Sequence, residues 1–325
     1  MKEKSLLKYM IHTIYLPRLC SDDDLKTMKG KYLDSEWILH QITKDTDVYD
    51  EETKQLVVSY RRKRLKKANI GLENFKCLAK ASRGRGASAG PIDPNSKYWT
   101  KRTVIETNGF RTGYLKKDGT PSKMKVNNQV MSQAIGYFNE IKGLGVNIPC
   151  RLSHYTQVNL QKYVNGIPFI EEIDTWYKKL APTHHRYQLD RACLKPHLKI
   201  GKSAFSTMTV NKNFRTALHK DSGDYGGYAC LSVLQEGRYN GGIFMMPGYG
   251  IGIDLRQGDI IVADVHEYHC NTEIWTTESQ DQHNATLNLK RDEGDGVGTI
   301  GANKPYSRIS LVLYLREKMI ECADA

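Results

Sequence analysis

The sequence has no long hydrophobic run and no close pair of cysteines. No stretch of about 18 apolar residues occurs, so we expect no membrane span. The charged start lacks the apolar segment of a signal peptide, which favours an intracellular protein, cytoplasmic or nuclear and not secreted. No CxxC pair is present and the cysteine count is odd, which predicts reduced thiols rather than a disulfide framework or a zinc site. The cysteines stand singly at positions 20, 77, 150, 193, 230, 270 and 322.

The composition is that of a folded, basic protein. Hydrophobic residues make up 39% of the 325 residues, enough for a core and too many for a disordered chain. This length allows one large domain or two modest ones. The net charge of +12 indicates a polyanionic partner such as nucleic acid, although a basic surface without such a partner is the alternative.

The first part of the chain differs from the rest. Residues 1–80 are mixed and charged, and we expect them to form an N-terminal basic helical region, followed by a second domain over 81–325. Helical turns are predicted over 35–42 and 69–78, with a short strand at Leu56–Tyr60 between them. The dense positive run 61–67 is typical of a solvated face, and phosphate contact is the alternative.

The middle of the chain contains a glycine-rich loop and two segments with helical patterning. Residues 82–96 hold three glycines and two prolines, which exclude the interior of a helix or strand. This loop is either a linker or a backbone that approaches a phosphate or cofactor, with Arg83 and Arg85 supplying charge. Helices are predicted over 128–141 and 169–180.

From about residue 200 the pattern changes to short apolar or alternating runs separated by turn residues. Six such strands behind a helical region predict an α+β fold whose core is a β-sandwich or jelly roll, covered by supporting N-terminal helices. The six predicted strands are 204–218, 228–234, 243–246, 250–255, 260–263 and 309–315.

Two histidines and an aspartate form a candidate metal site at strand ends. His219 and Asp221 are two residues apart in an extended segment, so both side chains point to one face. His269 ends a later strand, which is predicted over 258–269 and opens with a Gly-Asp turn. Two histidines and one carboxylate form the facial triad of non-haem Fe(II) oxygenases, which leaves room for an oxo-acid and O₂. His266 competes with His269, and we prefer His269 because it lies nearer the strand end and a predicted turn, Cys-Asn-Thr, follows it.

A strand-borne arginine completes the pattern. Arg308 lies in a predicted core strand, where a buried guanidinium needs a counter-charge. The distal carboxylate of 2-oxoglutarate would supply it through a bidentate pair, and Ser310 shares its face. Arg316 is the rival, but its charged neighbours indicate a position facing solvent.

With these residues in place, four stretches of the chain resemble the TET and base-J-binding-protein dioxygenases, in particular their compact viral and microbial branch. The resemblance covers roughly residues 80–320, and its four motifs are 204–221, 241–251, 258–272 and 308–316. It implies a double-stranded β-helix (cupin-like) core and a reaction that uses Fe(II), 2-oxoglutarate and O₂. It also implies that His269 is the distal iron ligand.

The resemblance also implies a substrate. The family oxidises the 5-methyl group of a pyrimidine, 5-methylcytosine or thymine, in nucleic acid. Such a base must be flipped out of the duplex while basic groups hold the phosphates. We expect DNA as the partner. Asn211 is the candidate for the oxo-acid pocket, on one strand face with Arg215 and His219. The candidates for substrate contact are Arg215, Arg83, Arg85 and Asn271, together with the basic run 61–67.

One segment departs from the pattern and leaves the substrate open. Residues 274–305 are long, polar and glycine-rich, as in a substrate lid or a disordered loop. Two other functions remain possible on the sequence: a dioxygenase of the same fold that acts on a protein side chain, and a non-catalytic nucleic-acid-binding module. The sequence does not decide the base, the choice of DNA or RNA, or the oligomeric state.

Overall fold

A computed structural model describes residues 11–82, 85–91, 104–107, 110–122, 128–143, 146–292 and 299–323. The α-helices are α2 (Asp22–Thr27), α3 (Ala68–Phe75), α4 (His154–Val158), α5 (Leu160–Leu180), α6 (Pro182–Ala192) and α7 (Glu278–Ala285). Short 3₁₀ turns occur at Ser35–Trp37, Gly86–Ala89, Pro196–Leu198, Pro247–Tyr249 and Glu317–Glu321.

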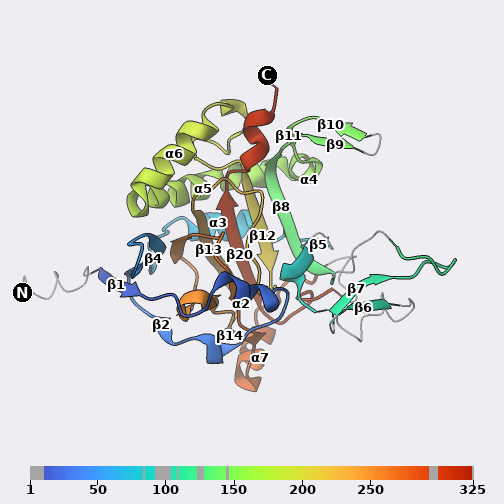
Figure 1. The fold of residues 1–325 in the computed structure, drawn as a ribbon, viewed down its shortest axis with the longest axis horizontal. Coiled ribbons are helices and arrows are strands. Elements are labelled where there is room, and N and C mark those ends of the chain that lie inside the picture. Colours follow the sequence, from blue (N-terminus) through green and yellow to red (C-terminus); the bar gives the residue numbers. More distant parts are fainter. Residues whose placement is uncertain are drawn as a thin grey trace, which may run out of the picture.

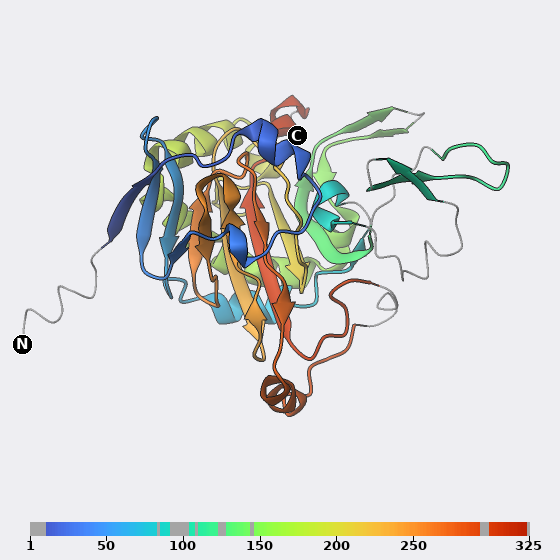
Figure 2. The same cartoon turned by 60° about the horizontal axis from the view of Figure 1, so that its bottom comes forward.

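Two sheets contain most of the strands (Figures 1 and 2). The large sheet has the order β1-β3-β4-β17-β13-β20-β12-β8-β11, with β5 paired to β8. Its strands are β1 (His12–Leu16), β3 (Thr46–Asp50), β4 (Leu56–Arg61), β5 (Ala81–Ser82), β8 (Val130–Phe138), β11 (Arg151–Leu152), β12 (Thr207–Lys212), β13 (Ala229–Glu236), β17 (Ile260–Ala263) and β20 (Ser307–Tyr314).

The small sheet has the order β18-β15-β16-β2, and three two-stranded ribbons complete the fold. Its strands are β2 (His40–Ile42), β15 (Phe244–Met246), β16 (Ile251–Ile253) and β18 (Cys270–Asn271). The ribbons are β6 (Val104–Thr107) with β7 (Phe110–Tyr114), β9 (Ile141–Gly143) with β10 (Val146–Ile148), and β14 (Asn240–Gly241) with β19 (Ile274–Trp275).

The large sheet separates two cores. On one face, α3 and α5 bury Phe75, Phe169 and Tyr177 against the sheet. On the other face, Phe244 and Ile251 of the small sheet pack against residues of β4, β13 and β17. Facing sheets with helices on the outer side constitute the predicted α+β jelly roll, which is therefore confirmed.

Strand β20 places the candidate site because its side chains alternate between the two faces. Ile309, Leu311 and Leu313 are buried in the core beneath the helices. Arg308 and Ser310 therefore project between the two sheets, where both line a cavity. The sequence thus assigned these two residues to the correct face.

The helical prediction for the N-terminal region was wrong. Residues 12–61 supply β1, β3 and β4 to the large sheet and β2 to the small sheet. Within 35–42 only a 3₁₀ turn forms before β2, whereas α3 occupies most of 69–78 as expected. Because β4 pairs with β17, the region is part of the same sheets as the later strands.

The helix predicted over 128–141 is also wrong, since these residues form β8. Main-chain pairing with β12 decides the conformation, with Met208 opposite Ile135. At Gly136 φ is +102°, and a Cβ there would lie 2.6 Å from the Ser206 carbonyl oxygen. A glycine is therefore required where the two strands approach. The helix predicted over 169–180 exists and begins earlier, at Leu160.

The long loop expected over 274–305 contains regular structure. It begins with β19 and continues into α7, which Figure 1 shows at the end of the molecule opposite the C-terminus. A capping box at Thr277 and Gln280 starts the helix, because each side chain binds the other residue's backbone NH. This Thr-x-x-Gln pattern was present in the sequence and predicts the helix start.

Two arginines of the basic run 61–67 form ion pairs within the fold. Arg61 is buried and makes two hydrogen bonds to Asp47, with its Nη1 2.8 Å from Oδ1. Arg64 forms an ion pair with Asp45. These two guanidinium groups already have carboxylate partners, whereas Arg62, Lys63, Lys66 and Lys67 are exposed, so phosphate contact by this run stays a prediction.

The structure contains one disulfide, which the scattered cysteines did not predict. Cys150 and Cys322 are bonded, whereas Cys20, Cys77, Cys193, Cys230 and Cys270 are free. The fold brings together two cysteines that lie 172 residues apart, a pairing that sequence spacing cannot reveal. Among the described residues, no helix has both the length and the apolar character that crossing a bilayer requires.

Candidate iron and 2-oxoglutarate site

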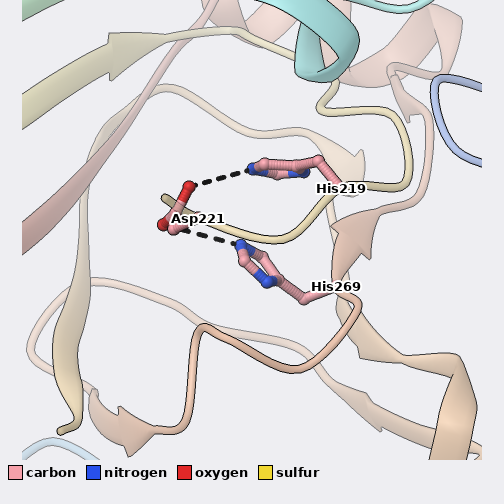
Figure 3. A group of neighbouring side chains, drawn as sticks. All are labelled: His219, Asp221 and His269. Carbon is pink, nitrogen blue, oxygen red and sulfur yellow. Dashed lines mark ion pairs between the residues drawn. The ribbon is translucent and has the colours of Figure 1, made fainter. Parts of the chain in front are cut away.

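His219, Asp221 and His269 converge at one end of the space between the sheets (Figure 3). One ligand atom from each residue lies within 4.8 Å of the others. The His219 Nε2 is 3.5 Å and the His269 Nε2 is 3.9 Å from carboxylate oxygens of Asp221. His219 and His269 also pair through their backbones, with N–O distances of 3.1 and 2.9 Å, which fixes the two rings side by side.

The hydrogen bonds of both imidazoles suit a metal ligand. The Nδ1 of His219 lies 2.8 Å from the Ala217 carbonyl oxygen, and the Nδ1 of His269 lies 2.9 Å from that of Glu267. Each Nδ1–H therefore donates to a carbonyl, so the Nε2 lone pairs face Asp221. Backbone anchoring of the outer nitrogen is common in metal sites, because it fixes the tautomer and the ring orientation.

The environment favours the neutral, metal-binding form of His219. Burial, reinforced by the neighbouring His269, lowers the pKa of His219 from 6.5 to about 4. A neutral imidazole retains its lone pair at physiological pH. Two imidazoles and one carboxylate match the donor set of a non-haem Fe(II) centre, so the residues present fit this metal.

His266 does not belong to this group. Its ring bonds to Asp264 at 3.2 Å in the turn after β17. The expectation that one strand runs from 258 to His269 was incorrect, because β17 ends at Ala263 and His269 immediately precedes β18. The turn between them directs His266 and His269 to different places.

A cavity of about 250 Å³ extends from the triad between the sheets. Its walls come from β12, β13 and β20 on one side and from Phe244 and Leu255 on the other. Of the residues expected to bind 2-oxoglutarate or substrate, Arg308, Ser310, Asn211, Asn271 and Arg85 line it.

Arg308 is a buried cation with unfilled bonding capacity. Its side chain is buried, and its Nη2 donates to the Gly242 carbonyl oxygen at 2.8 Å. The Nε has no hydrogen-bond partner, and no carboxylate pairs with this guanidinium among the residues that the structure describes. Burial lowers the pKa of Arg308. A buried guanidinium in this state is suited to a ligand carboxylate, which would supply both charge and hydrogen-bond acceptors.

Two other residues shape the place of Arg308. At Gly242 φ is +68°, and a Cβ there would lie 2.7 Å from the Arg308 Nε, so only glycine leaves room for the guanidinium. The Oδ1 of Asn213 accepts the Arg308 backbone NH at 2.7 Å, and its Nδ2 donates to the carbonyls of Gly301 and Tyr306. Neither Gly242 nor Asn213 was predicted from the sequence to shape the site.

The structure separates the remaining candidates. Asn211 accepts a hydrogen bond from Ser132 within the cavity wall. The Oδ1 of Asn271 accepts the Thr216 backbone NH at 2.8 Å, so this amide orders the cavity wall. Arg83 lies outside the described residues.

We had expected Arg215 to share a strand face with Asn211 and His219, but it does not. Strand β12 ends at Lys212, and Asn213 has φ +48°, so the alternation of side chains stops there. The Nη2 of Arg215 lies 2.7 Å from Asp34, and its guanidinium stacks over Tyr32. It is not among the cavity-lining residues.

The cavity wall also contains two charged residues, Asp224 and Arg316, that were not predicted from the sequence to lie there. Asp224 lines it, and burial together with nearby Asp221 raises the pKa of Asp224 to about 8. Arg316, which we had expected to face solvent, also lines the cavity. Its Nε donates a hydrogen bond to the Thr207 hydroxyl oxygen at 3.1 Å. Charged neighbours in sequence therefore did not indicate an exposed position.

A jelly roll with a His-Asp-His cluster and a buried arginine defines the class of Fe(II)- and 2-oxoglutarate-dependent oxygenases. Residues 133–317 match the family model Tet_JBP, described as the oxygenase domain of the 2OGFeDO superfamily. This match spans more than half of the chain, which therefore belongs to that family. Membership implies Fe(II) and 2-oxoglutarate, used with O₂, and the clustered His-Asp-His side chains are consistent with this implication.

Individual relatives share part of the chain. It is 35% identical over 154 residues to "Thymine dioxygenase JBP1" of Trypanosoma brucei brucei, which covers 47% of this chain and 17% of the relative. It is 31% identical over 194 residues to "Thymine dioxygenase JBP1-A" of Trypanosoma cruzi, covering 59% of this chain and 20% of the relative. The chain thus spans about a fifth of the length of these relatives.

A solved structure, "NgTET1 in complex with 5mC DNA", aligns with 95% of this chain and 84% of its own. Its sequence identity is 11% and its TM-score is 0.49.

Proposed function

We propose that this protein is a dioxygenase that hydroxylates the 5-methyl group of a pyrimidine, thymine or 5-methylcytosine, in DNA. The observation that carries the proposal is the cavity that is lined by both the His-Asp-His cluster and the buried guanidinium of Arg308, which has no carboxylate partner among the described residues. The curated relatives named as thymine dioxygenases support the substrate class, and the net charge of +12 favours a polyanionic partner.

In this proposal each group has a separate role. His219, Asp221 and His269 hold the iron, and Arg308 pairs with the distal carboxylate of 2-oxoglutarate while Ser310 lies on the same face. When bound, iron and 2-oxoglutarate with O₂ supply the oxidising power for attack on a C–H bond. The chain's own contribution is to orient these groups and to exclude water between the two sheets.

The charged residues of the cavity wall are candidates for substrate contact. Arg85 and Arg316 add positive charge beside Asp224, whose pKa is raised by burial and by nearby Asp221. We propose that a base flipped out of the duplex enters here, since its methyl group is otherwise enclosed in the stack.

A reconstituted reaction tests the proposal. Purified protein with Fe(II), 2-oxoglutarate and DNA containing thymine and 5-methylcytosine should release succinate and form 5-hydroxymethyl bases, measured by nucleoside mass spectrometry. The His219→Ala variant should lose this turnover. Full turnover by that variant would contradict the assignment of the iron site.

The same assay separates the alternatives. Succinate release that requires a peptide rather than DNA would indicate a protein hydroxylase. DNA binding without succinate release in the presence of Fe(II) would indicate a non-catalytic module.

A further inference from the structure

A second cavity lies away from the triad and has a different chemical character. Its volume is about 570 Å³, and its walls come from the segment after α3, the start of α5, the ends of β12 and β13, and the residues that follow α7. None of its lining residues lines the triad cavity. We call it the basic groove because six of its lining residues are cationic: Lys76, Lys80, Lys162, Lys212, Lys290 and Arg291.

Only part of this charge is balanced within the groove. Glu236 and Asp292 are its two acidic lining residues, which leaves a net charge of +4 from six cations and two anions. Lys76 pairs with Glu236 at 2.7 Å, and Lys212 pairs with Asp292 at 2.6 Å. Lys80 and Arg291 are exposed and have no ion-pair partner in the part of the chain that the structure describes. Lys162 lies 2.9 Å from the Sγ of Cys77, a weak acceptor that does not replace a carboxylate.

The wall of the groove that carries Arg291 is held in place. Asp292 and Asn303 exchange two hydrogen bonds of 2.9 Å, each side chain accepting the other residue's backbone NH. The ion pair of Asp292 with Lys212 joins this segment to the end of β12, and both side chains are largely buried. The excess cations are therefore presented by anchored backbone rather than by a free tail.

We propose that the basic groove binds the phosphodiester backbone of DNA, as a second nucleic-acid contact separate from the triad cavity. Fixed cations without carboxylate partners gain from phosphates, because each contact releases condensed counterions. The identity of the polyanion as DNA rests on the proposed function, whereas the groove and its charge do not. This contact adds affinity without touching the reacting groups.

Cysteine alkylation offers a direct test within the native chain. Cys77 lines the groove, whereas Cys193 follows α6, and Figure 1 shows α6 and α7 at opposite ends of the molecule. Both thiols are exposed, and each has a lysine Nζ nearby, Lys162 at 2.9 Å and Lys199 at 3.5 Å. Iodoacetamide labelling without Fe(II) or 2-oxoglutarate, followed by mass spectrometry of each cysteine, should show duplex DNA slowing the reaction of Cys77 and not that of Cys193.

Matched charge removals test the same contact by affinity. The variant Lys80→Ala/Arg291→Ala should bind duplex DNA roughly 10- to 30-fold more weakly at about 0.15 M salt, since each phosphate contact contributes about fivefold there. Its plot of log affinity against log salt should be shallower by about 1.8, or about 0.9 per contact. The control Lys178→Ala/Arg186→Ala removes the same charge from exposed positions on α5 and α6 and should retain the steeper slope.

Each result has a definite meaning. Equal labelling of Cys77 with and without DNA, or equal losses in the two double variants, would overturn the proposal. Protection of Cys77 by inorganic tripolyphosphate but not by DNA would overturn it in favour of a small-anion site. Because binding is measured without turnover, failure of methyl oxidation would leave these outcomes unchanged, and failure of the groove would leave the triad chemistry unchanged.

Discussion

Arg308 is the residue on which the 2-oxoglutarate assignment depends most. Its guanidinium is buried, and its Nε has no hydrogen-bond partner, so the protein alone does not satisfy it. Lysine keeps the positive charge but cannot form the two parallel hydrogen bonds that a carboxylate accepts from arginine.

The variant Arg308→Lys should therefore raise the KM for 2-oxoglutarate by roughly 10- to 150-fold, the equivalent of one charge-assisted hydrogen bond of about 1.5–3 kcal/mol. Succinate release at varied 2-oxoglutarate measures this effect. The variant Arg186→Lys, on the surface of α6, provides the control. An unchanged KM in Arg308→Lys would assign the carboxylate contact to another group, such as Arg316.

His219 makes stability depend on pH. Its pKa is lowered to about 4 in the folded protein, against an ordinary value of 6.5, so the unfolded chain binds this proton more tightly. The free energy of unfolding of the metal-free protein should consequently fall as the pH drops from about 6.5 toward 4.

Thermal melting of the metal-free protein and of His219→Gln from pH 7 to pH 4.5 tests this sign. The Tm of the wild-type protein should fall further across that interval than the Tm of the variant, because the variant has no imidazole to protonate. If the Tm of the wild type and that of His219→Gln fall equally with pH, His219 is not buried in the neutral form.

At the scale of elements, the turn between β14 and β15 controls the space around Arg308. A methyl group at position 242 would meet the Arg308 Nε at 2.7 Å, and φ there is +68°. Gly242→Ala should thus raise the KM for 2-oxoglutarate, by roughly tenfold or more if the displaced guanidinium loses one charge-assisted hydrogen bond.

A matched glycine separates this effect from backbone strain. Gly119 has φ +81°, and a Cβ there would have no atom within 4 Å. Gly119→Ala should lower the Tm, as an alanine at positive φ does, without changing the KM for 2-oxoglutarate. If both variants change the KM equally, the space beside Arg308 is not the cause.

The elements also show what the sequence could and could not predict. Short strands with turn residues between them predicted the jelly roll, and alternation along β20 placed Arg308 and Ser310 correctly. Alternation failed for Arg215, because Asn213 breaks the strand, and helical patterning failed for β8, because pairing with β12 overrides local preference. Partners distant in sequence, such as Gly242 and Arg308, gave no local signal.

At the scale of the whole molecule, the disulfide ties the segment before β11 to the last 3₁₀ turn. Cys150 and Cys322 enclose most of the jelly roll, so the bond restricts the unfolded chain over a long loop. Cys150→Ser/Cys322→Ser should lower the free energy of unfolding by about 2–4 kcal/mol. Denaturant titration under non-reducing conditions measures this free energy. Adding reductant should shift the unfolding curve of the wild type to that of the variant.

A suitable control is Cys193→Ser, which removes a free and exposed thiol. Its unfolding midpoint should match that of the wild type. A wild-type midpoint that is insensitive to reductant would show that the bond does not form in solution.

The pairing of β4 with β17 has a consequence for how the chain folds. Arg61 lies opposite Ile260, so an early strand reaches its inner neighbour only after some 200 further residues have been added. Until then β1, β3 and β4 can form no more than a small three-stranded sheet whose inner edge is open. Closing so large a loop costs entropy before the new contacts compensate for it. During synthesis on the ribosome, the sheet should therefore close late, and this open edge is where a nascent chain would be most prone to aggregate.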